Sequence, residues 1–123
     1  MSLCLDTGHV SYVGGDSHAI VAQHADRIGY VHLKSVDHVV VARVRAEGIS
    51  FADAVQLGAM VEPDAGEPDM PRLLAELNAV GVPLWTVVEH DMYPAPAGQP
   101  LRVATSTCRY YRSHGVRQSP PAS

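Results

Sequence analysis

The sequence predicts an α/β fold with about three parallel strands and covering helices, because three short apolar runs recur along the chain. The runs are residues 3–5, 28–31 and 84–88. Short apolar runs bounded by turn residues are typical of strands buried on both faces, as in parallel sheets. Segments of helical character separate the runs, so strand and helix alternate. Each run also leads into a side chain that can bind a metal, namely Asp6, His32 or Glu89.

The first part of the chain predicts two strands joined by one helix. After the first strand, residues 7–9 (Thr-Gly-His) are expected to form a loop, and Asp16 is a good helix N-cap. A helix over 17–25 follows, and 28–33 form the second strand.

The middle of the chain predicts two short helices and one long loop. The first helix covers 39–46 and ends at Gly48, and the second follows Ser50 and ends at Gly58, since glycine commonly ends helices. Residues 60–68 (MVEPDAGEP) have the composition of an irregular loop. A loop of this length in an α/β unit is more often functional than idle.

The last part of the chain predicts two helices around the third strand. Asp69 caps the first of them, with Pro71 in its first turn, and Gly81 closes it. A loop rich in proline and glycine covers 92–100 after the strand, and the final helix covers 100–114.

The composition argues against several functional classes. With 9 Lys and Arg against 13 Asp and Glu, the 123-residue chain has a net charge of −4 and no basic footprint for nucleic acid or an anionic membrane. No apolar stretch is long enough to cross a bilayer, and the first residues lack the pattern of a secretory signal. For Cys4 and Cys108 we expect two buried thiols in a reducing compartment. We therefore expect one soluble, cytoplasmic domain.

The strand-end residues predict a metal centre. The carboxyl ends of parallel strands meet at one edge of a sheet, so Asp6, His32 and Glu89 are expected to converge on one divalent cation. Two carboxylates and one imidazole suit Mn²⁺, Mg²⁺, Co²⁺ or Zn²⁺ and leave positions for substrate oxygens. Each residue also has an ordinary alternative: Asp6 as the cap of a turn, His32 as a satisfied core residue, and Glu89 as a solvated strand end.

Other polar residues carry less weight. Lys34 lies on the same side of its strand as His32, and a buried ammonium there needs an anion, a carbonyl or a sugar hydroxyl nearby. Four further histidines lie on expected helices or loops and are treated as solvated. They are His18, His24, His38 and His114.

Four short motifs together resemble a known family. They are residues 5–9 (LDTGH), 25–28 (ADRI), 31–34 (VHLK) and 87–89 (VVE). In this order they are similar to the C-terminal part of the xylose-isomerase-like TIM barrels, which are sugar isomerases, epimerases and dehydratases. Within that group, residues 42–55 (ARVRAEGISFADAV) point to the inosose dehydratases. The resemblance implies a partial (β/α)8 barrel over 1–116, followed by a disordered tail over 117–123.

The resemblance also implies roles for individual residues. Asp6, His32 and Glu89 would be metal ligands, and His9 would contact the substrate. Lys34 would sit beside the metal against substrate oxygens, and Glu89 is the ligand carboxylate that could double as a base. The implied cofactor is Mn²⁺ or Co²⁺, with Mg²⁺ or Zn²⁺ as alternatives. The implied reaction removes water from a keto-inositol by abstracting a proton next to the ketone.

The sequence departs from the family in several places. The family's fourth metal ligand, a glutamate on an earlier strand, has no counterpart here. Ser35 stands where aspartate is usual, His90 where glutamine is usual, and 64–66 (DAG) where a Gly-x-Gly turn is expected. About three of eight strand–helix units are present, which leaves two open sheet edges.

Open edges predict association with another chain. We expect self-association or a second chain that completes the barrel, acting on a small sugar or cyclitol. The competing interpretation is a non-catalytic α/β fragment or assembly module in which the metal site is a relic.

Overall fold

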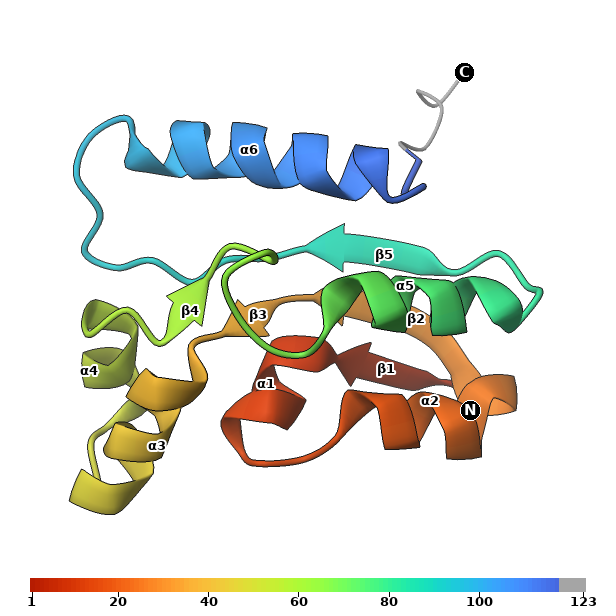
Figure 1. Cartoon of the computed structure of the whole chain (residues 1–123), viewed down its shortest axis with the longest axis horizontal. Helices are drawn as coiled ribbons and strands as arrows, with labels where there is room; N and C mark the ends of the chain where they lie inside the picture. Colours follow the sequence, from red (N-terminus) through yellow and green to blue (C-terminus); the bar gives the residue numbers. More distant parts are fainter. Residues whose placement is uncertain (118–123) are drawn as a thin grey trace.

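The computed structural model describes residues 1–117 and shows a parallel three-stranded sheet flanked by helices (Figure 1). The strands, in their order across the sheet, are β1 (Leu3–Asp6), β2 (Ile28–Leu33) and β5 (Trp85–Val88). Asp6 lies opposite His32, and Leu33 lies opposite Val88, so the three strands end side by side. The predicted α/β class and the partial barrel are confirmed, since within residues 1–117 the sheet stays open, with β1 and β5 as edge strands.

Local capping explains where most helices begin. The carboxylates of two predicted caps, Asp16 and Asp69, accept hydrogen bonds from first-turn amides. Asp37 and the hydroxyl of Ser50 cap two further helices in the same way, and Asp37 caps the first of these two. Gly48 ends that helix with a left-handed φ of 65°. The helical elements are α1 (Thr7–Tyr12), α2 (Ser17–His24), the 3₁₀ turn η1 (Ala25–Arg27), α3 (His38–Glu47), α4 (Phe51–Gln56), α5 (Met70–Ala79) and α6 (Gln99–Ser113).

One face of the sheet forms the main core. Leu5, Val31 and Leu33 point to this face and are buried against α2, α5 and the end of α6. The apolar side of α5, which includes Leu73, and Tyr111 of α6 complete the cluster. Burial of each large side chain here stabilises the fold by about 1.5–3 kcal/mol.

The opposite face of the sheet is open. Cys4, Tyr30 and Trp85 lie in register across the three strands and alternate with the core residues, so they share this face. Trp85 is 65% exposed and Tyr30 is 37% exposed. Cys4 is exposed as well, and so is Cys108 on α6, so the prediction of two buried thiols is wrong.

Two further differences from the expected elements appear, one caused by a local cap and one by a non-local strand pairing. Residues 7–9 belong to helix α1 rather than a loop, because Asp6 caps a helical turn there. Within the expected loop 60–68, β4 (Met60–Val61) pairs antiparallel with β3 (Ser35–Val36). This ribbon packs with α3 and α4 into a second apolar cluster beyond the ends of the parallel strands (Figure 1).

Two further expectations concern the C-terminal tail and the absence of a membrane-spanning segment. The predicted disordered tail lies outside the described residues except for Arg117. Among residues 1–117, no helix has both the length and the apolar character needed to cross a bilayer.

Candidate metal centre

The three strand-end residues lie close together. Asp6, His32 and Glu89 each offer one ligand atom, and these atoms lie within 4.8 Å of one another. The Nδ1 atom of His32 is 2.9 Å from a Glu89 carboxylate oxygen and 3.9 Å from an Asp6 oxygen. All three side chains are partly exposed, which leaves room for an exogenous ligand beside them. The predicted convergence of these residues is therefore present in the structure.

Lys34 lies at the centre of the same cluster. Its side chain is 2% exposed, and Nζ is 2.9 Å from Glu89, 3.0 Å from Asp91 and 3.6 Å from Asp6. The sequence predicted a buried ammonium that needs an anion, and the structure provides three carboxylates.

Asp6 has two roles that the sequence left as alternatives. One carboxylate oxygen accepts a hydrogen bond from the His9 amide at 2.9 Å and so caps α1. The other oxygen is 2.8 Å from His9 Nδ1 and also faces His32 and Lys34. His9 is half-exposed and lies against Phe51 of α4, with 5.7 Å between the ring centroids. Asp6 therefore caps α1 with one carboxylate oxygen and still presents the other to His32 and Lys34.

The charges of the cluster support one another. The hydrogen bonds from His32 and Lys34 lower the pKa of Glu89. Burial acts to raise the pKa of Asp6, but the hydrogen bonds from His9 and the charge of Lys34 outweigh it, so the net pKa lies below the usual value. Burial acts to lower the pKa of Lys34, but its bonds to Glu89 and Asp91 keep the net pKa above the usual value. At neutral pH the site therefore holds ionised carboxylates around a charged ammonium.

Three residues of this site were not assigned from the sequence. Asp91 bonds to Lys34, and its position two residues after Glu89 was the available signal, because both point to the same side. The buried Thr7 hydroxyl accepts a hydrogen bond from the Lys34 amide and donates one to the Lys34 carbonyl. Gly8 lies against the Lys34 side chain, where a Cβ atom would come within 2.5 Å of Cγ. The contacts of Thr7 and Gly8 join α1 to Lys34, a residue distant in sequence, so no local pattern marks them.

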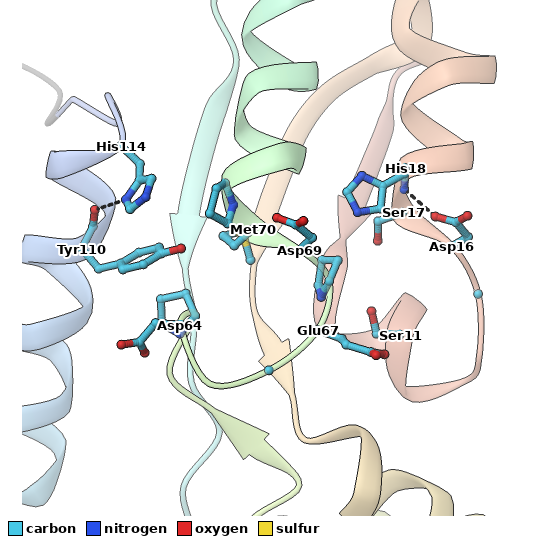
Figure 2. Close-up of a pocket in the computed structure, with 15 residues that line it drawn as sticks. Ser11, Asp16, Ser17, His18, Asp64, Glu67, Asp69, Met70, Tyr110 and His114 are labelled. Atoms are coloured by element: carbon cyan, nitrogen blue, oxygen red, sulfur yellow. Dashed lines mark hydrogen bonds between the residues drawn. The ribbon is translucent and has the colours of Figure 1, made fainter.

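A separate hollow of about 750 Å³ lies beside the starts of α2 and α5, and no residue of the metal centre lines it (Figure 2). His18 faces it and pairs with Glu76 of α5 at 2.7 Å, so the expectation of a solvated His18 is wrong. Asp16 and Asp69, which also line it, already accept hydrogen bonds from helix amides. Among residues 1–117, the acidic and histidine side chains that lie close enough together to hold a metal are those of Asp6, His32 and Glu89, so we place the chemistry at the strand ends.

The donor set at the strand ends fits a hard or borderline divalent cation. Two carboxylates and one imidazole are the ligands that Mn²⁺, Co²⁺, Mg²⁺ and Zn²⁺ accept. Ionised carboxylates brought this close repel one another unless a cation lies between them. In the structure, the Lys34 ammonium lies between them, 2.9 Å from Glu89 and 3.6 Å from Asp6.

Comparison with known proteins agrees with this arrangement. A family model described as "Xylose isomerase-like TIM barrel" matches residues 1–114. The chain belongs to the xylose isomerase-like TIM barrel family. Inosose dehydratase from Erwinia tasmaniensis is 38% identical over 115 residues, which cover 91% of this chain and 38% of that protein. Inosose dehydratase from Geobacillus thermodenitrificans is 38% identical over 112 residues, which cover 91% of this chain and 37% of that protein.

A relative that is not named as an inosose dehydratase matches with similar identity and is likewise covered only in part. The rhizopine catabolism protein MocC of Rhizobium meliloti is 38% identical over 104 residues, which cover 85% of this chain and 32% of that protein. The chain thus spans less than two-fifths of the length of these curated relatives. Its relation to sugar and cyclitol isomerases and lyases is clear, and the three β/α units correspond to part of the family's barrel.

Proposed function

We propose that this chain carries the divalent-metal part of a sugar or cyclitol lyase or isomerase site, related to that of inosose dehydratase. The observation that carries the proposal is the convergence of Asp6, His32 and Glu89 at the ends of three parallel strands. These residues would hold Mn²⁺ or Co²⁺, with Mg²⁺ or Zn²⁺ as alternatives. We further propose that residues 1–116 act as the C-terminal part of a barrel.

The proposed reaction is removal of water from a keto-inositol: a base takes a proton from the carbon next to the ketone, and the hydroxyl on the adjoining carbon leaves as water after a general acid protonates it. The ionised Glu89 carboxylate is the base, because it is partly exposed beside the cluster. The fixed charge of Lys34 stabilises negative charge on a substrate oxygen, and the exposed ring of His9 binds a further hydroxyl. A bound divalent cation supplies additional positive charge next to the developing enolate.

The complete reaction needs more than this chain, in our proposal. The open face and the two free edges of the sheet leave the site without walls on one side. A second copy or a separate chain with the remaining β/α units would close it. We therefore expect that the purified chain alone does not dehydrate inosose, and efficient turnover by the chain alone would contradict this part of the proposal.

The test is Mn²⁺ binding to the purified chain, measured by calorimetry. We expect micromolar binding by the parent and a loss of about 100-fold or more in His32→Ala and in Glu89→Ala, because each removes one of three ligands. His24→Ala and Glu47→Ala change the same residue types on exposed parts of α2 and α3 and should bind like the parent. Equal binding by His32→Ala, or no binding by a folded parent, would contradict the proposed site.

A second candidate is a non-catalytic assembly module with a relic metal site. The exposed aromatic residues of the open sheet face, Trp85 and Tyr30, favour this alternative. Sedimentation in the presence of EDTA separates the two functions. A stable oligomer that forms without metal, together with absent Mn²⁺ binding, would favour the assembly module.

A further inference from the structure

The Lys34 ammonium has three carboxylates as partners in the described structure. Nζ lies 2.9 Å from Glu89, 3.0 Å from Asp91 and 3.6 Å from Asp6, and the side chain is 2% exposed. A buried ammonium is stable only while an anion or an equivalent acceptor remains beside it. Any other cation that binds these carboxylates therefore competes with Lys34 for them.

The stem of Lys34 cannot move far from these partners. The Thr7 hydroxyl bonds to both the amide and the carbonyl of Lys34, at 2.9 Å and 2.7 Å. Gly8 lies so close that a Cβ atom there would approach Lys34 Cγ to 2.5 Å and Cδ to 2.8 Å. Because the backbone of Lys34 is held by hydrogen bonds and its side chain is enclosed, the ammonium can move between the neighbouring carboxylates but not out into solvent.

Two of the three carboxylates have a competing role. Asp6 and Glu89 are proposed ligands of a divalent cation, and a carboxylate oxygen that binds the cation is no longer a full partner for Lys34. The two positive charges also repel each other across the same carboxylates. Asp91 is outside the ligand group, and it already bonds to the ammonium at 3.0 Å.

We propose that Lys34 is the counter-ion of the metal-free site and that Asp91 holds its ammonium when Asp6 and Glu89 bind a divalent cation. This inference rests on the proposed function, because it requires that the strand ends bind metal. Asp91 is then a positioning residue, which sets the metal affinity through Lys34 without touching the metal.

A double-mutant cycle on the full chain tests this role, with Mn²⁺ binding measured by calorimetry. Asp91→Asn should weaken Mn²⁺ binding about tenfold, because Lys34 then keeps its hold on Glu89. Lys34→Met removes the competing cation and should strengthen binding severalfold. In the Lys34→Met background, Asp91→Asn should have no further effect, since the ammonium it acts on is gone. A plain loss of negative charge, or loss of a direct ligand, would weaken binding equally in both backgrounds.

A matched control and a second measurement keep the outcomes apart. Asp26→Asn removes the same charge at the opposite end of β2 and should bind Mn²⁺ like the parent. Titration with Mg²⁺, followed by the ¹⁵N and ¹H resonances of the Lys34 ammonium, should leave this signal protected in the parent and broadened in Asp91→Asn. Circular dichroism and thermal melts without metal establish that each variant is folded.

The results that overturn the inference differ from those that overturn the proposed function. Mn²⁺ binding by the parent together with unchanged binding by Asp91→Asn would overturn only the role of Asp91. An equal effect of Asp91→Asn with and without Lys34 would overturn only the route through Lys34. Absent binding by the folded parent would overturn both the metal site and the inference.

Discussion

The two faces of the β1–β2–β5 sheet carry different kinds of residues on the same strands. On the covered face, Val31 and Leu33 are 0% and 1% exposed beneath the helices. On the open face, the alternating positions are Tyr30, His32 and Lys34, with an exposed aromatic residue first and the charged cluster at the strand end. Neighbouring residues of β2 therefore point in turn to the apolar core and to the face that carries the candidate metal centre.

This contrast shows which face of the sheet is covered by this chain's own helices and which face is left uncovered. The covered face is closed by helices from this chain alone, with α2 and α5 packed on it. The open face matches the inward-facing side of a barrel, and the chain spans 38% of the length of a relative such as the Erwinia inosose dehydratase. Stability and the proposed activity therefore depend on different surfaces, and mutations can separate them.

The largest expected difference between the faces is in stability. Leu33→Ala should lower the free energy of unfolding by about 2–5 kcal/mol, because it leaves a cavity in the covered core. Trp85→Ala on the open face, where the side chain is 65% exposed, should change it by about 0.5 kcal/mol or less in the dilute monomer. Urea unfolding at low protein concentration measures both. Similar losses in the two variants would show that the open face is already covered in solution.

A smaller effect is expected at Gly8, which lies in α1 against the Lys34 side chain. An added Cβ would collide with the enclosed stem of Lys34, so Gly8→Ala should cost about 1–3 kcal/mol and displace the ammonium from the carboxylates. Gly29→Ala is the control on β2: an added Cβ would come within 2.9 Å of Ser2 Cβ but would meet no atom of Lys34, so any loss of stability there should leave Mn²⁺ binding unchanged. Urea unfolding gives the energies, and Mn²⁺ calorimetry gives the effect on the site. An unchanged Gly8→Ala would mean that Lys34 is less confined than its contacts indicate.

Much of this arrangement was predictable from the sequence because its determinants are local. Apolar runs define strands, and side-chain caps such as Asp16 and Asp69 define helix starts within a few residues. The metal centre was predictable for one non-local reason, which is that parallel strands end at a common edge. Asp6, His32 and Glu89 needed only that rule to be brought together.

Apart from residues 7–9, which the nearby cap of Asp6 makes helical, the errors arose where partners are distant in sequence. The ribbon formed by β3 and β4 consists of two-residue strands, which have no periodicity of their own. Cys4 alternates correctly with the core residue Leu5, but its exposure depends on what covers the open face, which its own segment does not encode. The contact between His18 and Glu76 joins α2 to α5 across 58 positions of the chain.

The contact between His18 and Glu76 gives the smallest expected effect. It tests whether a charged pair among the helices of the covered face stabilises the fold. The hydrogen bond from His18 and the nearby Arg72 lower the pKa of Glu76. A carboxylate with a lowered folded-state pKa stabilises the fold above its ordinary value of about 4.3 and loses this contribution as the pH falls below it. Glu76→Gln should therefore destabilise the chain by about 0.5 kcal/mol at pH 6, and the difference from the parent should shrink as the pH falls from about 4.3 through the lowered folded-state pKa.

The exposed pair of Arg43 and Glu47 is the control for this prediction. Both residues lie on α3 at 3.0 Å with more than half of each side chain exposed, so their contact bridges no two elements. Glu47→Gln should show a smaller loss than Glu76→Gln in urea unfolding between pH 6 and pH 3. If the two variants lose the same amount, the contact between His18 and Glu76 adds nothing to the packing of α2 on α5. The covered face would then be held by its apolar core alone, and ionised groups would matter only at the strand ends.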